Sequence, residues 1–170
     1  MSELSITLRL ENWDESRPLT REEAVEILNL PEEEMPKLLD CAYALRTKYK
    51  GKKVSVQLLT NVRSGNCSQN CAYCAQSRDS EAPIEKYRRV SDEKLYGDND
   101  LVDEKHLARH CIGLSGIGFS DEEIEDLADR IREMKKKETQ ICCSIGFLTE
   151  KQAKMLKEAG LDRINHNLNS

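Results

Sequence analysis

Three cysteines lie close together in the stretch NCSQNCAYCAQS, which runs from Asn66 to Ser77. Cys67, Cys71 and Cys74 place three thiol groups in one short segment, and Tyr73 directly precedes the last of them. Structural zinc sites and ferredoxin-type clusters each take four protein ligands. Three cysteines on a [4Fe–4S] cluster would leave one iron open, and a substrate can bind at an open metal position. The spacing therefore predicts a catalytic iron–sulfur site, with an incidental zinc or thiol cluster as the alternative.

Four further cysteines bring the total to an odd number, seven. The N-terminus MSELSITLRLENWDE has early acidic residues and no apolar segment of the kind found in secretory signals, so we expect a reducing, cytoplasmic location. In that compartment metal binding is a better first hypothesis than disulfides. Cys41 falls in a predicted helix and is interpreted as a packed thiol. A net charge of −5 argues against partners such as nucleic acid or an anionic membrane.

The elements around these cysteines can be predicted from capping residues and hydrophobic spacing. Residues 1–19 show no clear period and are expected to form a partly ordered arm. A capping box at Thr20 opens a short helix, and a second helix extends to about Tyr49. The side chains expected to point inward from these two helices are Ala24, Ile27, Leu28, Met35, Leu38, Leu39, Ala42 and Leu45. We expect residues 1–52 to hold this arm and these helices.

Residues 53–170 alternate between predicted strands and predicted helices. The strands are expected at 54–60, 109–115, 140–145 and 161–168. Helices are expected after capping residues Ser120 and Thr149. The first has an apolar stripe of Ile124, Leu127, Ile131 and Met134. Gly97–Asp100 should break the segment 91–108 into two short pieces. This alternation predicts an α/β fold with a parallel sheet. A four-stranded doubly wound sheet and part of a (β/α)8 barrel both remain open at this point.

The cysteine spacing CxxxCxxC after a strand, with the aromatic Tyr73, resembles the radical S-adenosylmethionine (radical SAM) superfamily. The resemblance implies that the open iron of a [4Fe–4S] cluster binds SAM, with Tyr73 among the residues that contact it. It also implies one-electron cleavage of SAM to methionine and a 5′-deoxyadenosyl radical. No catalytic residue beyond the cluster ligands is expected.

Longer stretches resemble the biotin synthase family from about Thr20 to Ser170, among them CAYCAQS, RHCIGLSG and CCSIGFLTEKQAKMLKEAGLDRINHNLN. This resemblance implies the N-terminal half of a (β/α)8 barrel and sulfur insertion that converts dethiobiotin to biotin. The family holds a second, [2Fe–2S] cluster as sulfur donor on three cysteines and an arginine. Cys111 and Cys142 match two of these cysteines. The third cysteine and the arginine match nothing in these 170 residues, so we expect the chain alone to be an incomplete fragment.

Strand alternation gives a check on the second cluster. If Cys111 points into the barrel, its face is shared by Arg109, Gly113 and Ser115. If Cys142 points inward, Cys143 must point outward, toward the helices. The alternative is that Cys111 and Cys142 are small core residues without a ligand.

The last predicted strand places Asn165, Asn167 and Asn169 on one face and His166 on the other. Buried amides require partners, and ligand groups could supply them. The resemblance implies that Asn165 and Asn167 contact dethiobiotin or SAM and that Asn169 contacts the SAM ribose, at a place that is often acidic. The alternative is that these asparagines cap the end of a strand. His166 is interpreted as a packed, hydrogen-bonded residue.

Other functions stay open beside this one. The chain could be another radical SAM enzyme of the same branch, hydrogenase-maturase-like or methylornithine-synthase-like. It could also be a non-catalytic iron–sulfur or zinc-binding module. The biotin synthase resemblance further implies a flavodoxin-type electron donor and a homodimer.

Overall fold

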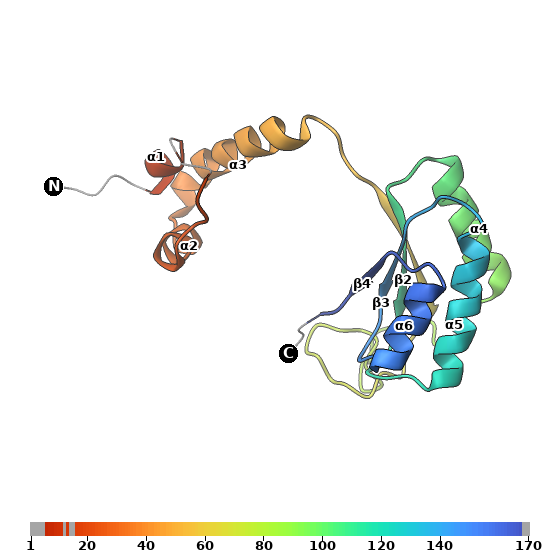
Figure 1. The fold of residues 1–170 in the computed structure, drawn as a ribbon. Coiled ribbons are helices and arrows are strands. Elements are labelled where there is room, and N and C mark those ends of the chain that lie inside the picture. Colours follow the sequence, from red (N-terminus) through yellow and green to blue (C-terminus); the bar gives the residue numbers. More distant parts are fainter. Residues whose placement is uncertain (1–5, 12, 14–15, 168–170) are drawn as a thin grey trace. The chain divides into compact units, whose positions relative to one another are not determined.

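The computed structural model describes residues 6–11, 13 and 16–167 of the chain. The chain divides into two compact units, residues 1–54 and residues 55–170. The first unit is helical, and the second holds alternating strands and helices (Figure 1). Apart from Cys41, all the cysteines belong to the second unit.

The first unit consists of α1 (Ile6–Glu11), α2 (Arg21–Leu28), a 3-10 turn η1 (Glu32–Glu34) and α3 (Met35–Lys50). The predicted capping box at Thr20 is present at the start of α2. Helix α1 lies within residues 1–19, the segment predicted to be a partly ordered arm. The predicted inward faces are only partly confirmed. Ala24, Ile27 and Leu38 are half-buried, but Leu28 is 84% exposed and no residue of α2 or α3 is fully buried. A unit of this size with three short helices encloses little core volume.

An open, four-stranded parallel sheet forms the centre of the second unit. Its strands are β1 (Gln57–Arg63), β2 (Arg109–Leu114), β3 (Ile141–Ser144) and β4 (Arg163–Asn165). They lie side by side in sequence order, so β1 and β4 are the edges. The predicted parallel α/β architecture is confirmed. The predicted bounds of the first and last strands are wrong at both ends, because β1 lies three residues later than the predicted 54–60 and β4 is shorter than the predicted 161–168. The middle two strands differ from the prediction by at most one residue at each end.

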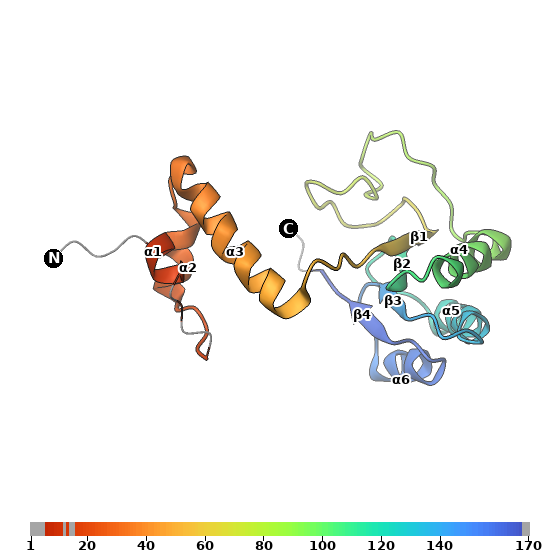
Figure 2. The same cartoon turned by 90° about the horizontal axis from the view of Figure 1, so that it is seen from above.

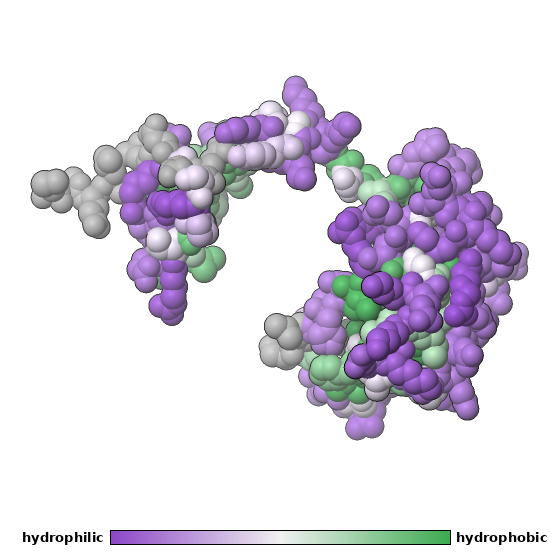
Figure 3. Space-filling model, in the orientation of Figure 1, coloured by the Kyte–Doolittle hydropathy of each residue, from purple (hydrophilic) through white to green (hydrophobic). Residues whose placement is uncertain are grey.

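Helices α4 (Asp92–Glu104), α5 (Asp121–Met134) and α6 (Glu150–Glu158) cover one face of this sheet (Figure 2). The predicted apolar stripe of α5 is buried against it, and the core members with no exposed surface include Ile112, Ile124, Ile131, Ile141 and Leu156. Hydrophilic residues cover the outer surface of the helices (Figure 3). Across the described part of the chain, no helix has the length and apolar character needed to cross a membrane.

Helix α4 is continuous, which corrects the expectation of two short pieces across Gly97–Asp100. The polar residues that suggested a break make tertiary contacts instead. Asp98 accepts a hydrogen bond from Thr60 Oγ1 in β1, at 2.6 Å. The Asn99 side chain donates to the carbonyl of Met134 at 3.2 Å. These bonds attach α4 to its neighbours, and they offset the low helix propensity of the segment.

Candidate functional site

The cysteine loop follows β1 and closes on itself through backbone hydrogen bonds. The N–H of Cys67 donates to the carbonyl of Gln76 at 2.9 Å, and the N–H of Arg78 donates to the carbonyl of Cys67 at 3.0 Å. A tighter turn joins Cys74 N–H to the carbonyl of Cys71 at 2.9 Å. All three cysteines are free and half-buried. The loop therefore holds three thiols together at the carboxyl end of β1.

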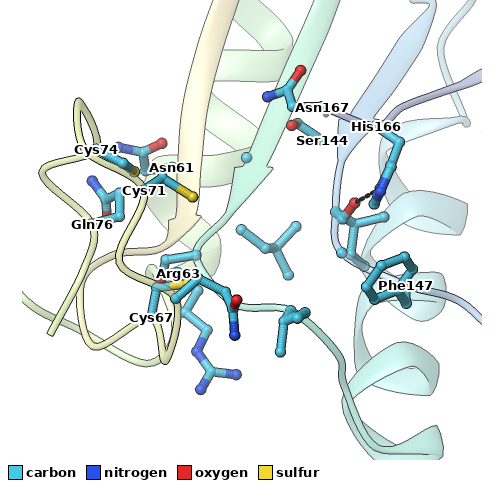
Figure 4. A pocket seen from close by; sticks show the side chains of 18 of the residues that line it. Asn61, Arg63, Cys67, Cys71, Cys74, Gln76, Ser144, Phe147, His166 and Asn167 are labelled. Atoms are coloured by element: carbon cyan, nitrogen blue, oxygen red, sulfur yellow. Dashed lines mark hydrogen bonds between the residues drawn. The ribbon is translucent and has the colours of Figure 1, made fainter. Parts of the chain in front are cut away.

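A cavity of about 470 Å³ lies at the carboxyl ends of the strands, and these three cysteines line one side of it. Phe147 and His166 lie across the cavity from the cysteine loop (Figure 4). Ligands of open parallel α/β sheets bind at this edge. The sheet and the loops that follow its strands contribute further lining residues, among them Asn61, Gly113, Ser115, Ser144 and Asn167.

The three cysteines offer thiol donors, which are the ligands of iron–sulfur clusters and of some zinc sites. A structural zinc ion takes four protein ligands, one more than this loop supplies. Within the described residues, no three His, Cys, Asp or Glu side chains are placed to hold a single metal ion. The three thiols that border the cavity are of the donor type that a [4Fe–4S] cluster takes.

Cys111 and Cys142 are register partners on β2 and β3, and both are half-buried. They lie outside the cavity lining, two residues nearer the amino ends of the strands than Gly113 and Ser144. The Cys111 thiol donates to Gln57 Oε1 at 3.0 Å. Burial, and next the neighbouring Cys142, raise the pKa of Cys111. The two thiols form a separate pair, which lies closer to the amino ends of the strands than the cavity does.

Cys143 lies on the opposite face of β3, as strand alternation predicts. It has no exposed surface and belongs to the hydrophobic core beneath the helices. Burial raises the pKa of its thiol to about 12, with a further contribution from Cys142. Cys41, in the first unit, is half-buried, and its Sγ lies 3.9 Å from the carbonyl of Thr7. Neither thiol lines the cavity.

The predicted asparagine face is only partly brought to the cavity. Asn167 lines it, whereas Asn165 is exposed on β4, outside the lining, and Asn169 is outside the described residues. His166 also lines the cavity, which corrects its assignment to the opposite face. Because β4 ends at Asn165, strict alternation does not apply to the residues that follow. The His166 Nδ1 lies 3.3 Å from the carbonyl of Ile145, and its ring centroid lies 5.2 Å from that of Phe147.

Several lining residues were not identified from the sequence. Asn61 could have been found, because it alternates along β1 with Gln57 and Leu59, whose side chains are also exposed on the open face. Phe147 and Gln76 lie in loops, where no periodic pattern points to a site. Tyr73, which was identified, lines the cavity and is 70% exposed.

Comparison with known proteins matches residues 61–170 to the Radical SAM superfamily. Curated relatives include the biotin synthases of Geobacillus kaustophilus and Bacillus subtilis strain 168, each 41% identical over 153 residues. The matched segment is 89% of this chain and 46% of each relative, so the chain spans about half the length of the curated relatives it matches.

Among solved structures, that of methylornithine synthase aligns with this chain with a TM-score of 0.74. The alignment covers 95% of this chain and 47% of the methylornithine synthase chain. Its sequence identity is 17%, so this likeness concerns the fold alone. The open sheet and the partial coverage agree with the predicted half of a barrel. With the family match across most of the second unit, the chain belongs to the radical SAM superfamily.

Proposed function

We propose that this chain supplies the cluster-binding and SAM-binding part of a biotin synthase, which inserts sulfur into dethiobiotin. The observation that carries the proposal is the shared cavity, where Cys67, Cys71, Cys74 and Asn167 meet at the carboxyl edge of the sheet. The 41% identity to biotin synthases supports this choice within the superfamily.

In this proposal the three loop cysteines hold a [4Fe–4S] cluster, and SAM binds at the iron that lacks a protein ligand. When bound, the cluster supplies the electron that cleaves SAM to methionine and a 5′-deoxyadenosyl radical. The chain contributes orientation: the loop fixes the three thiolates, and Tyr73 and Asn167 border the space beside them. A preorganised site of this kind limits the positions that the reacting groups can take.

The asparagines at the end of β4 and after it would recognise polar groups of the ligands. Asn167 can donate through its amide N–H groups and accept through its carbonyl, which suits a ureido or hydroxyl partner. We propose that Asn165 and Asn167 contact dethiobiotin or SAM. Asn169 is proposed for the SAM ribose, where an amide keeps an acceptor but lacks the charge of a carboxylate.

Cys111 and Cys142 are proposed as two ligands of the [2Fe–2S] sulfur donor. Their shared register and half-buried position on the open face of the sheet support this role. The remaining ligands, a cysteine and an arginine, would come from outside the matched residues. Free thiolates at five positions require a reducing compartment, so we propose that the protein works in the cytoplasm.

The test is reductive SAM cleavage by the anaerobically reconstituted chain, with deuterated dethiobiotin present. We expect 5′-deoxyadenosine that carries deuterium, measured by mass spectrometry. Cys71→Ala should abolish cleavage, and Cys41→Ala should retain it because Cys41 lies in the other unit. Cleavage without deuterium transfer would contradict dethiobiotin as substrate, and an absence of cleavage would contradict the whole proposal.

A further inference from the structure

The turn that leads into Cys67 has an uncommon backbone conformation. Gly65 has a φ of 75° and Asn66 a φ of 55°, so two successive residues are left-handed. Such a conformation persists only where the surroundings hold it in place. A side chain at Gly65 would also meet Lys86 Cγ at 2.6 Å. The position of the Cys67 thiol therefore depends on the contacts that fix this turn.

The side chain of Gln76 provides one of these contacts from the far end of the loop. The buried N–H of Gly65 donates to Gln76 Oε1, and the hydroxyl of Ser64 lies 3.2 Å from the same oxygen. On the other side of the turn, Ser115 Oγ donates to the carbonyl of Gly65 at 2.7 Å. Both backbone groups of Gly65 are thus satisfied by side chains.

The backbone of Gln76 holds the adjacent cysteine as well, because its carbonyl accepts the N–H of Cys67 at 2.9 Å. One residue therefore contacts both the turn and the first cluster cysteine. Without the side-chain oxygen, the N–H of Gly65 would be buried without an acceptor, which favours another loop conformation.

We propose that Gln76 is a positioning residue. Its side-chain oxygen holds the Gly65–Asn66 turn and thereby places the Cys67 thiol where it can bind the cluster. The inference rests on the proposed [4Fe–4S] site but assigns a role to a residue outside its ligands. The required property is an acceptor at Oε1. Both side-chain contacts of Gln76 with the turn are made by Oε1.

The first test compares iron release to a chelator from the reconstituted chain and two variants. Gln76→Leu removes the acceptor at similar size, and release should become faster by about tenfold. Gln76→Glu keeps an oxygen acceptor, and release should stay within about twofold of wild type. Gln140→Leu is the matched control, because it makes the same chemical change at an exposed position outside the cavity lining.

The second test needs no cluster. Amide hydrogen exchange across residues 64–67 of the cluster-free chain should be faster in Gln76→Leu and unchanged in Gln76→Glu. The proposal would be overturned if exchange in Gln76→Leu were as slow as in the wild type. It would also be overturned if exchange became faster by the same factor in both Gln76 variants. If the wild-type chain binds no [4Fe–4S] cluster, the proposed function fails, and exchange alone still decides whether Gln76 holds the turn.

Discussion

Replacing Gly146 with alanine should destabilise the edge of the cavity, because a β-carbon there has no space. It would lie 2.3 Å from the carbonyl oxygen of Ile117 and 2.4 Å from its carbonyl carbon. The contact is with backbone, so no side chain can move away. The loops after β2 and β3 must separate, which also breaks the 2.7 Å bond from Phe147 N–H to Ile117 O.

The expected loss follows from these two effects. Overpacking costs about 1–3 kcal/mol and a lost hydrogen bond about 1 kcal/mol, so the free energy of unfolding should fall by about 2–4 kcal/mol. Urea denaturation followed by circular dichroism measures this change. SAM affinity should fall as well, because Gly146, Ile117 and Phe147 all line the cavity.

Gly118→Ala is the matched control in the neighbouring loop. Its β-carbon would meet nothing within 4 Å and its φ lies outside the left-handed region, so the change should stay within about 0.5 kcal/mol. Equal stability of the Gly146 and Gly118 variants would refute the close approach of the two loops.

Three further predictions concern the core, helix α4 and pH. Cys143→Ser should destabilise by about 1–3 kcal/mol because it buries a hydroxyl in the apolar core, whereas the half-buried Cys142→Ser should change stability by less than about 0.5 kcal/mol. Gly97→Ala should stabilise by about 0.5–1 kcal/mol, because Gly97 lies inside a helix with open space around its Cα. Burial alone would raise the pKa of Asp162, but the N–H of Ile141 and the ammonium of Lys135 lower it overall. Asp162→Asn should therefore cost about 1–2 kcal/mol at pH 7, and this difference should vanish as the pH falls below about 4 and the wild-type carboxyl is protonated.

Urea denaturation tests each of these, at several pH values for Asp162→Asn. Equal losses for the two cysteine variants would contradict the assignment of their faces. A destabilising Gly97→Ala would contradict a continuous α4. A difference for Asp162→Asn that grows toward low pH would contradict the lowered pKa of Asp162.

Local signals predicted α5 and α6 well. The capping boxes at Ser120 and Thr149 and the apolar stripe of α5 act within a few residues, and the structure contains them all. Prediction failed where distant partners decide the outcome. The polar segment at Gly97–Asp100 reads as a break, but Asp98 and Asn99 hydrogen-bond to other elements. The apolar spacing of α3 predicts a buried face, but no residue of this helix is fully buried and Leu39 is 61% exposed.

The candidate site shows the same division. Strand alternation predicted that Cys142 and Cys143 point to opposite faces, because β3 is regular at these positions. The same rule misplaced His166, because β4 ends one residue before it. The contacts of Gln76 depend on loop closure, and no pattern in the sequence encodes them.

The central claim is that Cys67, Cys71 and Cys74 hold a [4Fe–4S] cluster with an open iron. Electron paramagnetic resonance of the reduced, reconstituted chain, with and without SAM, tests it most directly. We expect a [4Fe–4S] signal whose g values shift when SAM is added, and no such signal in Cys71→Ala. A signal that SAM leaves unchanged, or one that survives in Cys71→Ala, would contradict the claim.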